Sequence, residues 1–402
     1  MAMTFDAIVV GARVAGSPTA MLLARRGHRV LVLDRATFPS DVLSTHLIHV
    51  PGMAMLGRWG LCETVEGAGA PPHERFTMDF GPFAISGPPP AVDGAAHPYC
   101  VRRTVLDTIL VGAARDAGAE VREGVTVEGL LRDDDGRVVG VRGAGFAERA
   151  RIVIGADGLR SVVARETGAE TYDDGPALTA CYYAYYRGLE SPDGVVGAEI
   201  YQRGDRAIVL FPTNDGLTCV FVACPIAQMH EFRTDVEGNY LEAIGRAPGL
   251  AERIARAERA ERILATADVP NFFRRSAGPG WALVGDSGYY KDPCQASGIT
   301  DAFVCAQLLA DAVHAGLSGE RGLDEAVAAY AAERDERFTP ALHLTRQLAS
   351  MEPPDPQTAA MFATIARSPA ETTRFFGVLQ GSTPIPEYFS PDNIGRIMSG
   401  AS

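Results

Sequence analysis

A glycine-rich turn near the start of the chain is the strongest constraint on its fold. The turn follows an apolar run over residues 5–10 and precedes residues 17–26, which have the composition of a helix. A second apolar run over residues 29–33 closes on Asp34. A buried strand, a helix and a second strand in this order predict a βαβ unit, the beginning of an α/β fold with a parallel sheet.

The residues of the turn predict what this unit binds. Gly11 permits a tight turn, and Gly16 lets the helix pack closely against the strand. The start of the helix points N–H groups at a pyrophosphate, and Asp34 can accept a ribose hydroxyl. Arg13 stands where this fingerprint has its middle glycine, and its guanidinium either serves the phosphates or points outward. The residues expected to contact a dinucleotide here are Gly11, Arg13, Ala15, Gly16, Asp34 and Arg35.

Charge and composition exclude several classes of protein. The formal net charge of −13 argues against nucleic acid or an anionic membrane as the main partner. No apolar run reaches the roughly 18 residues that a membrane-spanning helix needs, so we expect a cytoplasmic protein without stable membrane insertion. Lys291 is the only lysine, and its neighbours fit neither a pyridoxal-phosphate site nor a P-loop. The seven scattered cysteines lack a C-x-x-C pair, which predicts reduced thiols and no metal site.

Two later segments repeat the design of an apolar strand that ends near an aspartate. One ends in Asp157-Gly158, and the other ends in Gly285-Asp286 and continues into an alanine-rich helix over residues 301–314. An aspartate at the carboxyl edge of a sheet, followed by a helix N-terminus, can bind polyol hydroxyls and an anionic ring edge. These segments therefore predict contacts to the same cofactor as the first turn.

The three motifs, in their order along residues 5–315, resemble those of FAD-dependent monooxygenases of the para-hydroxybenzoate hydroxylase type, called group A. The resemblance implies that Asp286 binds the ribityl and pyrophosphate part of FAD, and that Gly298 and Ile299 present N–H groups to the flavin. Ala296, Ser297 and Thr300 depart from the residues that are commoner in the family. The further cofactor-binding residues that the resemblance implies are Arg103, Asp157, Gly158, Asp286, Pro293, Ser297, Gly298 and Ile299.

The resemblance also implies a reaction. NAD(P)H would reduce FAD, and O₂ would then form a C4a-hydroperoxyflavin that hydroxylates or epoxidises an aromatic or polyketide-like small molecule. The chain has one complete dinucleotide fingerprint, so NAD(P)H is expected as a transient co-substrate near Asp157 and Gly158. An external flavin reductase is the alternative source of electrons.

Three other functions compete with this one. An FAD-dependent reductase of C=C bonds, similar to geranylgeranyl reductases, stays open as the alternative. A flavin-dependent halogenase would need a lysine in the first third of the chain and a W-x-W-x-I-P stretch, and the chain offers only Lys291, Trp59 and Trp281. A flavin-binding protein without catalysis is disfavoured because the motifs are intact.

Turn-rich segments divide the chain into three parts. The predicted fold is α/β, with a discontinuous Rossmann-like FAD-binding domain, an antiparallel β-sheet substrate domain and C-terminal helices. A long helix over residues 323–348 is expected to break at Pro340, and Asp133 to Asp135 are expected at a hairpin tip. The predicted domains are 1–74, 98–176 and 271–345 for FAD, 75–97 and 177–270 for the substrate-covering sheet, and 346–402 for a helical or loop-rich tail.

A substrate pocket is expected on the flavin-facing side of the second sheet. Tyr183 and Tyr185 share one face of a strand. The resemblance places Tyr201 in the cavity, and no arginine clamp occurs at residues 212–214, which favours a neutral polycyclic or aryl substrate. His46 lies in the loop that runs near the flavin, and it joins Tyr201 as a candidate catalytic residue. The predicted substrate-lining residues are Tyr183, Tyr185, Tyr201, Leu210 and Pro212.

Overall fold

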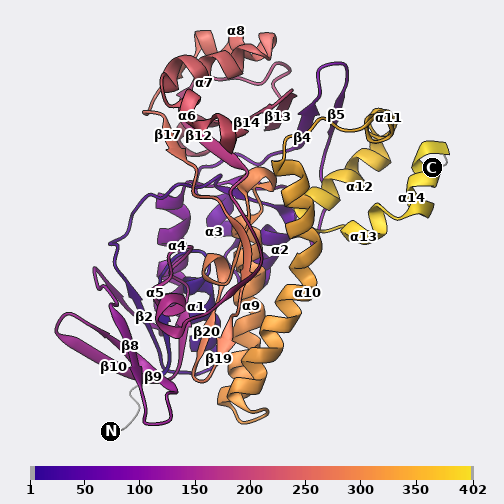
Figure 1. Ribbon diagram of the computed structural model, residues 1–402. Coiled ribbons are helices and arrows are strands. Elements are labelled where there is room, and N and C mark those ends of the chain that lie inside the picture. Colours follow the sequence, from indigo (N-terminus) through magenta and orange to yellow (C-terminus); the bar gives the residue numbers. More distant parts are fainter. Residues whose placement is uncertain (1–4, 400–402) are drawn as a thin grey trace.

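The computed structural model describes residues 5–399, which form two large sheets, a long helix beside them and a group of terminal helices. In Figure 1 the first sheet lies in the lower part of the view, the second sheet lies above it, and α10 runs along one side. The terminal helices extend to the right, far from the N-terminal end. The α/β class, the antiparallel second sheet and the C-terminal helices are confirmed.

The first sheet contains the predicted βαβ unit. Its central strands are parallel, and their side chains are almost all buried, as expected for a sheet covered on both faces. Its strands, in spatial order, are β19 (Ala277–Gly278), β20 (Trp281–Leu283), β10 (Phe146–Gly155), β1 (Phe5–Val10), β2 (Val30–Asp34) and β7 (Glu120–Glu123). β10 extends into a hairpin with β9 (Val138–Gly143) and β8 (Gly129–Arg132), and the predicted aspartate-rich tip joins the last two.

Helices cover the first sheet on one face, and the hairpin with a short helix covers the other. The main hydrophobic core lies between the sheet and the helical layer. Its principal helices are α1 (Gly16–Arg25), α4 (Arg103–Asp116) and α9 (Gly298–Leu317). The opposite face packs against the β8–β9 hairpin and α5 (Val162–Thr167). Both layers fix the carboxyl ends of β1, β10 and β20 at one edge.

The second sheet combines two segments that are distant in sequence. The strand at residues 75–79 pairs in parallel with the strand at residues 197–203, so the segment around residue 80 does join the later β-rich block. The strands, in spatial order, are β16 (Glu258–Arg259), β12 (Thr179–Arg187), β15 (Leu217–Pro225), β14 (Arg206–Pro212), β13 (Gly197–Arg203), β4 (Arg75–Asp79) and β5 (Ala84–Gly87), with β17 (Leu264–Thr266) paired to β12. One face packs on α6 (Met229–Phe232), α7 (Val236–Gly245) and α8 (Pro248–Arg256).

Short elements connect these layers. Near the first sheet lie β3 (Leu47–Ile48), α2 (Val50–Arg58), α3 (Cys62–Glu66) and β6 (Tyr99–Cys100). A small third sheet consists of β11 (Thr171–Gly175), β18 (Asn271–Arg274) and β21 (Tyr289–Tyr290). The 3₁₀ turns are η1 (Asn214–Gly216), η2 (Ile226–Gln228), η3 (Gly285–Ser287) and η4 (Pro293–Gln295).

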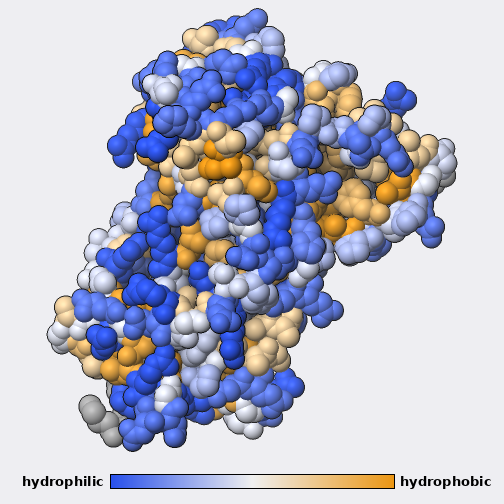
Figure 2. Space-filling model, in the orientation of Figure 1, coloured by the Kyte–Doolittle hydropathy of each residue, from blue (hydrophilic) through white to orange (hydrophobic). Residues whose placement is uncertain are grey.

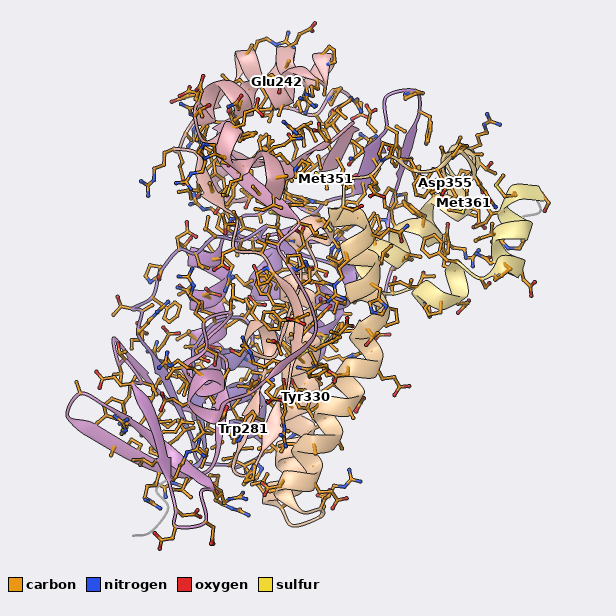
Figure 3. The ribbon with its side chains drawn as sticks, in the orientation of Figure 1. Glu242, Trp281, Tyr330, Met351, Asp355 and Met361 are labelled. Carbon is orange, nitrogen blue, oxygen red and sulfur yellow. The ribbon has the colours of Figure 1, made fainter. Side chains whose placement is uncertain are left out.

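Helix α10 (Leu323–Ala349) runs unbroken through Pro340, so the predicted break is wrong. Proline removes one N–H from the helix, which leaves the carbonyl of Glu336 without its helical partner. Glu336 is exposed, so water can satisfy that carbonyl. The buried side of the helix is anchored to the first sheet: the hydroxyl of Tyr330, labelled in Figure 3, donates to the carbonyl of Leu283 at 3.0 Å.

The terminal helices pack against the second sheet and close one end of the molecule. They bury Met361, Phe375 and Phe376 in the same core as Phe76 and Ile85 of the sheet. Asp355 begins the first of them by accepting hydrogen bonds from two backbone N–H groups, and it is labelled with Met361 in Figure 3. These helices are α11 (Pro356–Ile365), α12 (Pro369–Gln380), α13 (Ile385–Tyr388) and α14 (Pro391–Ser399).

Arg334 joins α10 to the strands beside η3, and its removal is expected to destabilise the protein. Its buried guanidinium donates to Ser276 Oγ at 2.6 Å and to the carbonyl of Gly288 at 2.7 Å. Arg334→Ala leaves these buried acceptors without donors, so we expect a loss of about 3 kcal/mol in the free energy of unfolding. Urea denaturation measures it, with Arg321→Ala, an exposed arginine before α10, as the control. Equal stability of the two variants would contradict this role.

Candidate flavin site

The first turn has a shape that only glycine permits. Gly11 has a φ of +102°, and a Cβ there would lie 2.4 Å from the carbonyl oxygen of Ala156. A Cβ on Gly16 would lie 1.8 Å from the carbonyl oxygen of Gly11. The turn therefore packs directly against the end of β10, next to the second motif.

The charged residues of this turn are held by neighbouring protein groups. Asp34 is buried and accepts hydrogen bonds from the N–H of Ala12 at 2.6 Å and of Ala36 at 2.8 Å. Arg13 donates to Asp107 on α4 at 2.5 Å. The charge of Arg13 is thus paired with α4, and its contact with phosphates stays a prediction. Arg35, beside Asp34, is exposed.

Asp107 connects the first turn to the helix that carries Arg103. Its second carboxylate oxygen accepts from Arg103 Nε at 3.0 Å, so one fully buried carboxylate bridges two arginines. Burial raises the pKa of Asp107, and the charges of Arg103 and Arg13 partly offset this. The bridge fixes Arg103 at the wall of the cavity described below.

The second motif links the first and third motifs. Asp157 accepts from Ser161 Oγ at 2.5 Å and from the N–H of Val162 at 2.6 Å, so its carboxylate caps α5. The N–H of Gly158 donates to Ser287 Oγ at 2.9 Å, directly after Asp286. Asp157 therefore stabilises the edge of the sheet, and its predicted contact with NAD(P)H stays a prediction.

The third motif lines a cavity at the carboxyl edge of the first sheet. Asp286 stands in η3, lines the cavity and is exposed to solvent through it. The protein packed around the cavity partly desolvates the carboxyl and raises the pKa of Asp286 to about 6; the nearby Arg103 lowers it and Asp301 raises it further. The cavity lining also includes the predicted residues Arg103, Pro293, Ser297, Gly298 and Ile299.

The cavity matches the chemistry of FAD. The N-terminus of α9 contributes Gly298 and Ile299, where first-turn N–H groups can receive an electron-rich ring edge. Arg103 supplies a positive charge for phosphate, and Asp286 supplies an acceptor for hydroxyls. A Cβ on Gly285 would lie 2.7 Å from Cβ of Ala15, so the first and third motifs are in contact. The three motifs thus lie against one another beside this cavity, and the contacts of the individual residues with FAD stay a prediction.

The predicted catalytic histidine lies behind the wall of this cavity. His46 has no exposed surface, and its Nε2 is hydrogen-bonded to the hydroxyl of Tyr185. Burial, with help from Arg103, lowers the pKa of His46 to about 3, so the ring is neutral. Contact of His46 with flavin or substrate is therefore not supported by this structure; the ring fixes the loop before it against the second sheet.

The predicted substrate pocket is divided between the two faces of the second sheet. Tyr183 and Tyr185 are buried on the face toward the flavin cavity, as predicted for that pair. Leu210 is buried on the opposite face, and Tyr201 packs there too, with its hydroxyl donating to Glu199. Grouping these residues in one pocket was wrong. Pro212 ends β14, and its carbonyl oxygen accepts a hydrogen bond from Nε2 of His73 at 2.8 Å.

The residues at the cavity that were not predicted include an ion pair. Lys291 and Asp301 both line it and form an ion pair of 2.8 Å between Nζ and Oδ2. The signal in the sequence was the single lysine of the chain, placed five residues after Asp286. Among residues 5–399 no cluster of three His, Cys, Asp or Glu side chains is placed to hold a metal ion, and no helix is long and apolar enough to span a membrane. All seven cysteines are free.

Curated relatives share parts of this chain. FixC of Salmonella typhi is 29% identical over 234 residues, which are 55% of this chain and 49% of FixC. The chain thus matches about half the length of that relative. The digeranylgeranylglycerophospholipid reductase of Methanosarcina acetivorans is 25% identical over 329 residues, which are 78% of this chain and 76% of the reductase.

Solved structures share the whole fold. The flavin-dependent brominase Bmp2 superposes with a TM-score of 0.82 at 18% identity, covering 98% of this chain and 97% of its own. PqsL of Pseudomonas aeruginosa superposes with a TM-score of 0.73 at 21% identity, covering 93% and 99%. The family model described as "FAD binding domain" matches residues 4–344. The converging motifs and this match show that the chain belongs to the family described as "FAD binding domain".

Proposed function

We propose that this chain is an FAD-dependent monooxygenase that uses NAD(P)H and O₂ to hydroxylate or epoxidise a small organic molecule. The observation that carries the proposal is the contact of all three motifs at one edge of the sheet, where the third motif lines a cavity. The described residues contain one Rossmann-type βαβ turn, so a nicotinamide would dock transiently. PqsL, a fold neighbour, is described as a probable FAD-dependent monooxygenase, which agrees with the proposal.

The residues of the chain would bind, orient and shield the cofactor. Bound FAD supplies the redox chemistry and the activation of O₂. Arg103 and the N-terminus of α9 offset negative charge at two places in the cavity. The packed side chains of Tyr183 and Tyr185 form a dry layer behind the loop of Ser44 and Thr45, which lines the cavity. Such shielding keeps water from a reactive flavin.

A reductase of C=C bonds is the second candidate. The observation in its favour is the similarity to a digeranylgeranylglycerophospholipid reductase over 78% of this chain. Both functions need FAD and a reductant, and they differ in whether O₂ enters the product. An external flavin reductase in place of direct NAD(P)H use is compatible with either.

Oxygen consumption separates these functions. The FAD-loaded protein is mixed with NADH or NADPH and a panel of phenols and polyketide-like aromatics, with dissolved O₂ and product measured together. We expect O₂ uptake coupled to product and incorporation of ¹⁸O from labelled O₂. Equal product formation under strict anaerobiosis would contradict monooxygenation and support the reductase. Bromide added in a parallel reaction tests halogenation, and a brominated product would replace the proposal.

A further inference from the structure

A second cavity lies on the other side of the Lys291–Asp301 pair. Lys291, Asp301 and Ser297 line both this cavity and the flavin cavity, so the two spaces share one wall. The rest of its lining comes from η4, from α10 and from the segment at residues 378–386, which joins α12 to α13. The terminal helices that form this wall also carry apolar surface in the view of Figure 2.

The shared wall contains a buried positive charge. The side chain of Lys291 is 7% exposed and that of Asp301 is 13% exposed. Ser297 Oγ donates to Asp301 at 3.2 Å, and Lys291 Nζ lies 5.7 Å from the centre of the Tyr289 ring. An ammonium group has three N–H donors, and Asp301 takes one of them. Donors therefore remain for a ligand at the boundary between the cavities.

A second cation lines the same cavity without an acidic partner. Within the described residues, Arg337 on α10 has no ion pair or hydrogen bond to another side chain, unlike Arg334 and Arg346 of the same helix. The neighbouring wall is apolar, with Phe338, Val378 and Ile385. A cavity with two cations and an apolar wall fits an apolar molecule that carries one anionic group.

We propose that this cavity binds the substrate, and that the substrate is an apolar molecule with a carboxylate or phosphate group held by Arg337 and Lys291. This inference rests on the proposed function and changes the expected substrate from neutral to anionic. The side of the second sheet that faces the flavin is filled by Tyr183 and Tyr185, which are 5% and 1% exposed, so it offers no room there. The cavity at α10 provides that room next to the flavin site.

Binding to the FAD-loaded protein tests the proposal without turnover. The probes are 6-phenylhexanoate, 6-phenylhexyl phosphate and the neutral 6-phenylhexanol, titrated in the absence of nicotinamide. Calorimetry gives the affinity, and the visible flavin spectrum reports whether the probe reaches the shared wall. We expect at least one anion to bind about tenfold more tightly than the alcohol and to perturb the flavin spectrum, because a charged hydrogen bond adds to the same apolar contacts. The two anions distinguish a carboxylate from a phosphate substrate.

Substitutions identify the residues that bind the anionic group of the probe. Arg337 is exposed, so Arg337→Gln should fold and should remove about tenfold of the anion affinity while leaving the alcohol unchanged. The double variant Lys291→Gln with Asp301→Asn removes both buried charges together and should also weaken anion binding. Arg321→Gln is the matched control, since Arg321 lies outside the cavity lining. Equal affinity for anion and alcohol, or an unchanged anion affinity in Arg337→Gln, would overturn the proposal. Because no turnover is involved, neither result depends on whether oxygen is consumed.

Discussion

Asp286→Ala is expected to strip FAD from the protein. The carboxyl faces the cavity beside Arg103 and the N-terminus of α9, where no other carboxylate of η3 can replace it. Hydrogen bonds to a charged group contribute about 1.5–3 kcal/mol, so FAD affinity should fall by roughly 10- to 100-fold. Visible absorbance of the purified protein and FAD titration of the apoprotein measure the loss. Asp134→Ala, at the exposed tip of the β8–β9 hairpin, should keep full flavin content.

The same carboxyl gives the apoprotein a characteristic pH dependence. Its pKa is about 6 when folded and near its ordinary value of 3.8 when unfolded. Well below pH 4 the carboxyl is protonated in both the folded and the unfolded protein, so it does not lower the stability of the folded apoprotein there. Between about pH 4 and pH 6 the unfolded form ionises first, and the folded apoprotein loses stability. Asp286→Asn should therefore raise the Tm of the apoprotein at pH 8 and leave it unchanged at pH 3.5. An equal shift at both pH values, or full flavin content in Asp286→Ala, would show that the motif is misplaced.

Gly16→Ala is expected to disrupt the first turn and abolish FAD binding. The added Cβ would sit 1.8 Å from the carbonyl oxygen of Gly11, so the turn must open. Overpacking of this kind costs about 1–3 kcal/mol or more, and the displaced α1 can no longer present its N–H groups. Gly57→Ala in α2 is the control, because a Cβ there meets nothing within 4 Å. Circular dichroism, thermal unfolding and flavin content together check the result; a Gly16→Ala protein with normal flavin content would contradict the geometry.

The sequence predicted the first βαβ unit and its glycine turn correctly because their signals are local. Strand, turn and second strand follow one another within thirty residues, and β1 spans Phe5–Val10, the same residues as the apolar run. Gly16 is required by a contact within the turn itself, and Gly11 by its positive φ and by the close approach of Ala156. The Asp157 and Gly285-Asp286 motifs each end a buried strand of the same sheet, so parallel pairing was enough to bring them together.

The substrate pocket was mispredicted because strand register is not a local property. The alternation of side chains along β12 correctly placed Tyr183 and Tyr185 on the face opposite to that of Tyr182 and Tyr186. Which residues of β13 and β14 share their face depends on pairing. Tyr201 pairs with Ile208, Ile208 with Val222 and Val222 with Tyr182, so Tyr201 follows the row of Tyr182. A shift of one residue in the register of any one of these strand pairs would have placed Tyr201 on the same face as Tyr183 and Tyr185.

The second cavity, beside Lys291 and Asp301, could not be predicted from the sequence for a related reason. Arg337 and Ile385 are nearly fifty residues apart and line one cavity, while α10 continues through Pro340 between them. A rule that ends helices at proline places them in unrelated segments. The lone Lys291 was noticed in the sequence, but its position between two cavities follows from the packing of α9 and α10.

Titration of the apoprotein with FAD and with FMN tests the central claim most directly. The account predicts one FAD per chain, bound without a covalent bond, and much weaker binding of FMN, which lacks the adenosine half that the Gly11–Gly16 turn and Asp34 are placed to hold. Calorimetry gives stoichiometry and affinity, and release by denaturation shows whether the flavin is free. Equal affinity for FMN and FAD, or no flavin binding at all, would contradict a site built from all three motifs.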